Sequence, residues 1–224
     1  MEKRTPLSKE RVLHAAVDLA DEGGIEALSM RRLARQLGVE AMSLYNHVAN
    51  KDEILSGITD LVASEIDLPS DGVDWKIAIR RSAVSAREVY VRHKWASSLQ
   101  MSRQGGGPAQ LRSADWMLRT LREAGLSQEL TYHAYHILQA YILGATVQQL
   151  NFPYKAEEVA GLAESFLQRL PTDEYPDFVE HVKQHLEPRQ GKEGGFELGL
   201  DLILDGLEQA RDTPRRRPRA RRSR

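Results

Sequence analysis

The sequence has no cysteine among its 224 residues, which excludes disulfide bridges, thiolate zinc sites and cysteine nucleophiles. It also has no apolar run that approaches the roughly 20 residues of a membrane-spanning helix. Its N-terminus, Met-Glu-Lys-Arg-Thr-Pro, leads into no apolar signal core. We find no alternating strand pattern and no internal repeat. These absences predict a cytoplasmic protein without membrane contact, built from helices.

The sequence also lacks the residue patterns of catalytic sites. No Ser, His and Asp follow the order of a known hydrolase, and no cluster of three His, Asp or Glu residues has metal-ligand spacing. Gly105, Gly106 and Gly107 follow no strand, so they do not form a phosphate-binding loop. We therefore expect a protein that is not an enzyme and that carries neither a cofactor nor a metal.

The charge of the chain is distributed unevenly. The net charge is −1, from 31 basic and 32 acidic residues, but seven arginines fall within residues 214–224. The other 24 basic residues face 32 acidic ones, so the rest of the chain carries about −8. A protein with an acidic body binds nucleic acid through a local basic patch. Residues 212–224 are predicted to be a disordered tail, which either adds attraction to phosphates or is simply solvated.

Residues 28–51 predict two short helices joined by a tight turn. Ser29 is a good N-cap for the first helix, and Gly38 can end it in a left-handed conformation without a Cβ penalty. The second helix is predicted from Ala41 to about Val48, with apolar residues four apart facing inward. Its outward residues are Met42, Ser43, Tyr45, Asn46 and His47. This is the layout of a helix-turn-helix, whose second helix enters the major groove of DNA.

The rest of the chain predicts helices only. A first helix over residues 8–22 completes an N-terminal three-helix head, and Asn50 opens a fourth helix that connects the head to the body. The predicted body helices span residues 75–94, 111–124, 127–149, 156–169, 175–186 and 196–211. We therefore expect an all-α fold with a helix-turn-helix domain (1–51), a connecting helix and linker (52–72), a helical body (73–211) and a tail (212–224).

The last predicted helix carries two adjacent apolar rows. One row is Phe196, Leu200, Ile203 and Leu207, and the other is Leu198 and Leu202, with Gly199 and Gly206 beside them. Packing within one chain needs one row, so two rows indicate that this helix and the apolar 127–149 helix also meet a second subunit. A fully buried core helix would show the same pattern. The residues that we assign to a dimer interface are Tyr141, Phe196, Leu200, Ile203 and Leu207.

Residues 24–51 resemble the DNA-binding head of the tetracycline-repressor (TetR) family. The signature is Leu-Gly-Val, then Leu-Tyr-Asn-His-Val, then Asn-Lys, and the resemblance extends over residues 8–66. The helix that begins at Phe196 resembles the end of the branch nearest the tetracycline repressors. The resemblance implies that the body binds an unidentified small-molecule effector and forms a homodimer through a four-helix bundle. It also implies a double-stranded, palindromic DNA operator, which is released when the ligand shifts the connecting helix and separates the two heads.

The resemblance assigns DNA contacts position by position to Arg31, Ala41, Met42, Ser43, Tyr45, His47 and Lys51, and the amide of Asn46 adds an eighth expected contact. Tyr45 and Lys51 match phosphate contacts, and Lys51 lies at a helix N-terminus that favours anions. Arg31 matches a base or phosphate contact and is alternatively a solvated surface residue. His47 also matches such a contact and alternatively stacks inside the head.

The residues that open the recognition helix are unusually apolar. Ala41 and Met42 cannot form bidentate hydrogen bonds, so they contact thymine methyl groups or shape the fit. Asn46 could pair with adenine N6 and N7. We therefore expect an operator that differs from one read by an amide at the first position.

The ligand side departs from the tetracycline repressors, which hold a drug-bound magnesium ion through a histidine and a later acidic partner. Residues 96–101 contain no histidine and residues 146–150 read Thr-Val-Gln-Gln-Leu, so we expect no such metal. His133 and His136 have metal-ligand spacing but no evident third ligand. An apolar pocket with orienting polar groups is predicted from Trp95, Leu99, Met101, Trp116, Tyr132, His133, His136, Gln139 and Leu143. Each of these is alternatively a core or interface residue.

The function that these observations predict is a ligand-responsive DNA-binding repressor. One alternative is a DNA-binding regulator or architectural protein without a small-molecule inducer, and another is an enzyme with a DNA-binding head. A thermal-shift screen separates the first two, because a ligand at 100 Kd stabilises a protein by roughly 2.7 kcal/mol.

Overall fold

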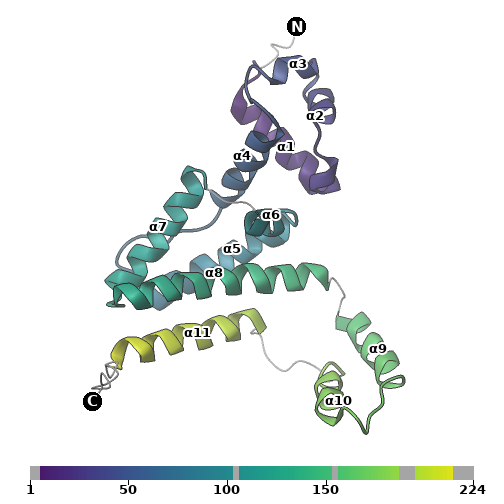
Figure 1. Cartoon of the computed structure of the whole chain (residues 1–224), viewed down its shortest axis with the longest axis vertical. Helices are drawn as coiled ribbons and strands as arrows, with labels where there is room; N and C mark the ends of the chain where they lie inside the picture. Colours follow the sequence, from purple (N-terminus) through teal and green to yellow (C-terminus); the bar gives the residue numbers. More distant parts are fainter. Residues whose placement is uncertain (1–5, 103–105, 153–155, 187–194, 214–224) are drawn as a thin grey trace, which may run out of the picture.

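The structure is a computed structural model, and it describes residues 6–102, 106–152, 156–186 and 195–213. These ranges contain helices and turns without a strand, which confirms the all-α expectation (Figure 1). The elements are α1 (Lys9–Gly23), the 3₁₀ turn η1 (Ile25–Ala27), α2 (Met30–Leu37), α3 (Ala41–Leu44), α4 (Lys51–Ala63), α5 (Trp75–Arg92), α6 (Ala96–Ser102), α7 (Pro108–Glu123), α8 (Gln128–Asn151), α9 (Ala156–Leu167), α10 (Pro176–Lys183) and α11 (Gly195–Asp212). Within these ranges, no helix combines the length and apolarity needed to cross a membrane. The stretch between the predicted helices 175–186 and 196–211 and the predicted tail lie outside the described residues, apart from Gly195, Asp212 and Thr213.

The head packs α1, α2 and α3 around one small apolar core. Val12, Leu33 and Leu44 come one from each helix and are completely buried. Ser8 and Ser29 cap α1 and α2, since each side chain accepts a hydrogen bond from the backbone N–H three residues later. Gly38 ends α2 with a φ of 66°, as its position in the turn predicts.

The second helix of the motif is shorter than the sequence predicts. The expectation of a helix from Ala41 to about Val48 is wrong beyond Leu44, where α3 ends. The chain then winds more tightly, because the amides of residues 45–47 donate to carbonyls three residues back. Asn50 follows with an extended backbone and begins the next helix, so the recognition segment is confined to residues 41–47.

Helix α4 joins the head to the body. At its start Asn50 accepts the Glu53 N–H at 2.8 Å, while the Glu53 carboxylate accepts the Ala49 N–H at 2.6 Å. This reciprocal pair resembles a capping box that closes one residue before the cap. Further along, Asp60 Oδ1 accepts two backbone N–H groups at the start of α7, at 2.9 and 3.0 Å. The connector is therefore anchored to the body by a side chain that caps another helix.

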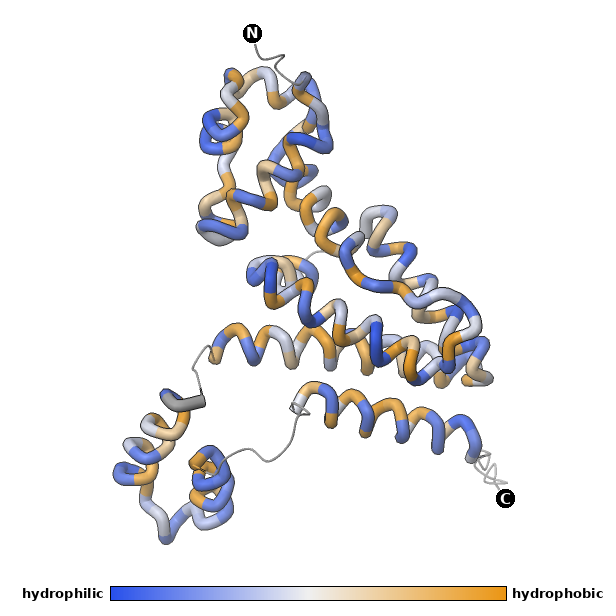
Figure 2. The backbone as a smooth tube through the Cα atoms, turned by 180° about the vertical axis from the view of Figure 1, so that it is seen from behind, coloured by the Kyte–Doolittle hydropathy of each residue, from blue (hydrophilic) through white to orange (hydrophobic). Residues whose placement is uncertain are grey.

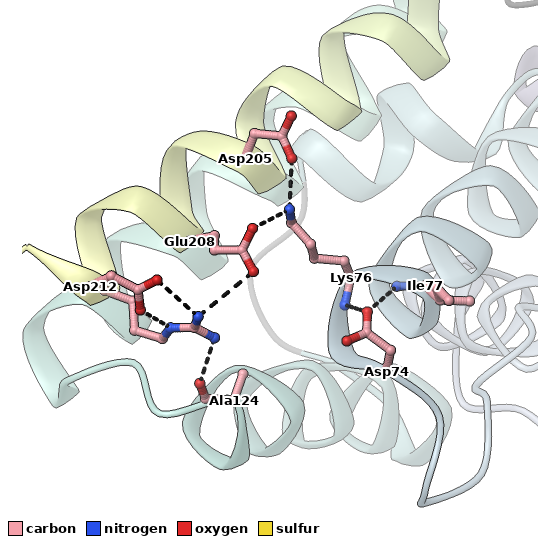
Figure 3. Close-up of polar contacts among 8 residues, drawn as sticks. Asp74, Lys76, Ile77, Ala124, Asp205, Glu208 and Asp212 are labelled. Carbon is pink, nitrogen blue, oxygen red and sulfur yellow. Dashed lines mark hydrogen bonds and ion pairs between the residues drawn. The ribbon is translucent and has the colours of Figure 1, made fainter.

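The body is arranged around α8, which contacts α5, α6 and α7 and also α11. Helices α8 and α11 lie side by side in both views, and apolar residues recur along each (Figures 1 and 2). A row of ion pairs fixes α11 against α5. The pairs are Lys76 with Asp205 and Glu208, Arg80 with Asp201, and Arg87 with Glu197. Figure 3 shows the Lys76 end of this row.

Helices α9 and α10 form a hairpin that stands away from the rest of the body (Figure 1). They pack against each other, with Phe166 edge-to-face on Phe178 at 6.1 Å between ring centroids. Leu162 and Tyr175 of this hairpin remain 44% and 52% exposed.

Candidate nucleic-acid interface

The recognition segment lies at the end of the head that is remote from α8 and α11 (Figure 1). Leu44 is its buried anchor, while Met42 is 75% and Tyr45 is 47% exposed. None of the eight predicted DNA-contact residues is buried. Arg31, Met42, Tyr45, Asn46 and Lys51 are exposed, and Ala41, Ser43 and His47 are half-buried. The local fold therefore presents these side chains to a partner without unpacking the head.

Exposed basic residues flank the recognition segment in sequence, on α2 and at the start of α4. Arg31, Arg32 and Arg35 are exposed on α2, and the last two were not singled out from the sequence. Lys51 is the first residue of α4, where the helix dipole also favours phosphate. Two residues after Lys51, the pKa of Glu53 lies below its usual value, first because the carboxylate accepts the Ala49 N–H and second because it pairs with Lys9. That carboxylate supports the turn and stays charged there.

The nine residues of the predicted ligand pocket differ in exposure. Met101, Tyr132, His133 and His136 are exposed on the outside of the body. Both indoles have structural partners. Trp95 Nε1 donates to Asp21 at 2.7 Å, and Trp116 Nε1 donates to the Pro69 carbonyl at 3.0 Å. The residues that stay half-buried against the core are Leu99, Gln139 and Leu143.

The exposed polar cluster on α8 is built around one aromatic ring. Tyr132 contacts His133 and His136 edge-to-face, with centroid distances of 5.3 and 4.7 Å. No third His, Asp or Glu joins them as a metal-binding group in the part of the chain that the structure describes. A separate open groove of about 620 Å³ runs along α5 and shares no residue with the predicted pocket. It is lined by Asp67, Ile77, Arg80, Arg81, Val84, Ser85 and Glu88.

The residues of the predicted dimer interface are largely covered within the single chain. Phe196, Leu200 and Leu207 are at most 7% exposed within a single chain, so they pack inside the subunit. Tyr141 joins them, since its ring stacks on Phe196 at 5.4 Å and its hydroxyl donates to the Phe196 carbonyl at 2.8 Å. Ile203 is half-buried against the same core.

The other row of α11 is the one left on the surface. Leu198 is 57% and Leu202 is 65% exposed, and Ile137 on α8 is 47% exposed. Gly144 on α8 and Gly206 on α11 have nothing near the position of a Cβ, so the surface beside them is open.

Comparison with known proteins gives two family matches. Residues 12–58 match the family described as bacterial regulatory proteins, tetR family, and residues 68–211 match the tetracyclin repressor-like C-terminal domain. Among curated relatives, the HTH-type transcriptional repressor DrrR1 of Streptomyces coeruleorubidus is 33% identical over 213 residues. That alignment covers 90% of this chain and 77% of the relative.

The solved structures that resemble most of the chain include two with a bound partner. ActR of Streptomyces coelicolor, a TetR family protein in complex with actinorhodin, is 28% identical with a TM-score of 0.79, and the match covers 93% of this chain and all of ActR. BioQ bound to its double-stranded DNA operator is 26% identical with a TM-score of 0.63, over 91% of this chain and 99% of BioQ.

Proposed function

The chain belongs to the tetR family of bacterial transcriptional regulators, and we propose that it is a homodimeric repressor that releases its operator when a small molecule enters the body. The observation that carries the proposal is the outward presentation of residues 41–47 on a head joined to a large helical body. This arrangement supports a binding function and not a catalytic one. Because its target is DNA, we place the protein in the cytoplasm.

On the DNA side, Tyr45 and Lys51 bind phosphates and fix the register of the head. Met42, Ser43 and Asn46 then face the base edges in the major groove. Met42 is the most exposed apolar side chain of the segment, and it suits a thymine methyl group better than a hydrogen-bonding edge. Arg31, Ala41 and His47 complete the contact surface.

The homodimer is proposed to form through the exposed row of α11 and the adjacent face of α8. Leu198, Leu202 and Ile137 offer apolar area there, and Gly144 and Gly206 allow close helix approach. Two helices from each subunit then make a four-helix bundle. A two-fold dimer of this kind presents its two heads to a palindromic operator, with half-sites about one helical turn apart.

On the ligand side, the relatives support a small organic effector, since ActR is described in complex with actinorhodin. In this chain we propose that Leu99, Gln139 and Leu143 contribute to the site, because they are half-buried on α6 and α8, two helices that contact each other. The body begins at α5, and α4 transmits its movement to the head.

The decisive test is substitution of Tyr45 after genome-wide mapping of bound DNA has defined the operator. Tyr45→Ala is expected to weaken binding by a similar factor on operator and unrelated DNA, since a phosphate contact carries no sequence information. Tyr45→Phe isolates the hydroxyl, and sedimentation checks that both variants remain dimers. Operator affinity that is unchanged in a fluorescence titration of Tyr45→Ala would refute the assignment of the recognition segment.

A further inference from the structure

The head touches the body at a second place besides α4. Near the end of α1, the Asp21 carboxylate meets the turn between α5 and α6. His93 Nδ1 lies 2.9 Å from both of its oxygens, and Trp95 Nε1 donates to Oδ1 at 2.7 Å. One head carboxylate thus accepts hydrogen bonds from two body side chains, which requires the proton of His93 to be on Nδ1.

The turn that donates these bonds is well buried and is tied to the connector as well. The His93 side chain is 7% exposed, and its Nε2 lies 3.3 Å from Glu65, just beyond the end of α4. Glu65 also accepts from Arg92 at 2.7 Å. Residues 92–95 therefore have little freedom to turn away from Asp21 without breaking several polar contacts at once.

Local helix physics does not explain an aspartate at this position. Asp21 lies in the last turn of α1, where the helix dipole disfavours a negative charge, and that turn holds no basic residue. The two N–H donors from the body offset this cost. The sequence separations of 72 and 74 residues show that the compensation is entirely tertiary.

Two attachment points constrain the head in a way that one does not. The Asp60 cap on α7 holds the connector, but alone it leaves the head able to pivot about α4. The Asp21 contact lies on α1 and engages the α5–α6 turn, so it opposes that rotation of the head. Helix α6, which starts directly after Trp95, carries Leu99 of the proposed ligand site.

We propose that Asp21 is a positioning residue through which the α5–α6 turn sets the angle of the DNA-binding head. The His93 and Trp95 hydrogen bonds hold the angle that operator binding needs, and movement of α6 reaches the head by loosening them. The second statement rests on the proposed function, whereas the first concerns head position alone.

The test measures head position directly. The chain has no cysteine, so Glu26→Cys in the head and Glu123→Cys on α7 allow two spin labels without background. Labelled chain is diluted into unlabelled chain, so that the distance is read within one subunit by pulsed electron paramagnetic resonance. Asp21→Ala removes the acceptor, Trp95→Phe removes one donor but keeps a packed ring, and Asp18→Asn is the exposed control on the same helix.

Asp21→Ala and Trp95→Phe are both expected to broaden the head-to-body distance distribution, while Asp18→Asn leaves it narrow. Operator affinity should fall roughly tenfold or more, as for loss of a hydrogen bond to a charged group. The double variant should bind the operator no more weakly than Asp21→Ala does, because both changes act on one contact. A narrow, unshifted distribution in Asp21→Ala, even with a lowered melting temperature, would overturn the proposal. Absence of operator binding by the wild type would count against the proposed function instead, and the distance measurement would still decide the role of Asp21.

Discussion

Single carboxylates account for several of the decisive contacts in this chain. Glu53 closes the N-terminus of α4, Asp60 caps α7, and Asp21 binds the α5–α6 turn. Each accepts N–H donors that would otherwise lack a partner at a helix end or in a buried turn. None of these three carboxylates belongs to the eight predicted DNA contacts.

Glu53 makes the stability of the head depend on pH. Its pKa is lowered from 4.5, first by the Ala49 N–H and then by Lys9, so the charged form is favoured in the folded state. The resulting stability is present above pH 4.5 and is lost as the pH falls through the lowered folded-state pKa. Glu53→Gln should therefore be less stable than wild type at pH 7, and the difference should shrink in acid.

Urea unfolding at a series of pH values measures this difference, with Glu22→Gln as the exposed head control. The control should show no comparable trend. A gap between wild type and Glu53→Gln that stays constant down to pH 3 would contradict the role given to the carboxylate.

The residues that could be predicted are those whose partners are close in sequence. Ser29, Gly38 and Asn50 act within three or four positions of themselves, so their spacing was sufficient to predict the helix ends. Asp21 and Asp60 act across 72 and 49 residues, and nothing in their neighbourhood marks them. Side-chain caps supplied by another helix follow only from the tertiary fold.

At the scale of helices, periodicity located the elements but not their orientation. Both apolar rows of α11 fit a buried face, and the fold packs Phe196, Leu200 and Leu207 inside the subunit. Ion pairs between α11 and α5 determine which row of α11 faces inward. Asp201 and Asp205 pair with Arg80 and Lys76 on α5, which turns Leu200 and Leu207 inward and leaves Leu202 outside.

This orientation predicts the effect of charge on the exposed row. Leu202→Glu should convert the proposed dimer to monomers, because it places two like charges near the two-fold axis of an apolar interface. Leu111→Glu on α7 is a matched control, since Leu111 is 62% exposed and Leu202 is 65% exposed. Sedimentation equilibrium distinguishes the two states, and a stable dimer of Leu202→Glu would exclude α11 as the contact.

At the scale of the whole molecule, the sequence predicts the overall architecture better than it predicts the roles of single residues. The head signature, the helical body and the family were predictable because they depend on local pattern. The partners of single side chains were not, because Trp95 and Trp116 look like pocket walls in sequence and donate to Asp21 and Pro69 in the fold. An aromatic residue with a polar atom suits either role, and only its partner decides between them.

Charge at the scale of the whole chain bears on the tail. Outside residues 214–224 the chain carries about −8, while the tail adds seven arginines. If these arginines reach DNA, removing residues 214–224 should weaken binding to operator DNA and to unrelated DNA by the same factor, since phosphates carry no sequence information. The salt dependence should also become shallower, by about 0.9 in the logarithmic slope for each phosphate that the arginines no longer neutralise.

Fluorescence anisotropy at several salt concentrations measures the affinity and its salt slope for each protein. The matched variant keeps the tail length and has all seven arginines replaced by glutamine. That variant should behave like the truncation, because the effect belongs to charge and not to chain length. The proposed contacts of the head with DNA are unchanged in both variants, so selectivity for the operator should be unchanged. Equal slopes in wild type and both variants would mean that the arginines are only solvated, and that the head alone supplies the attraction to DNA.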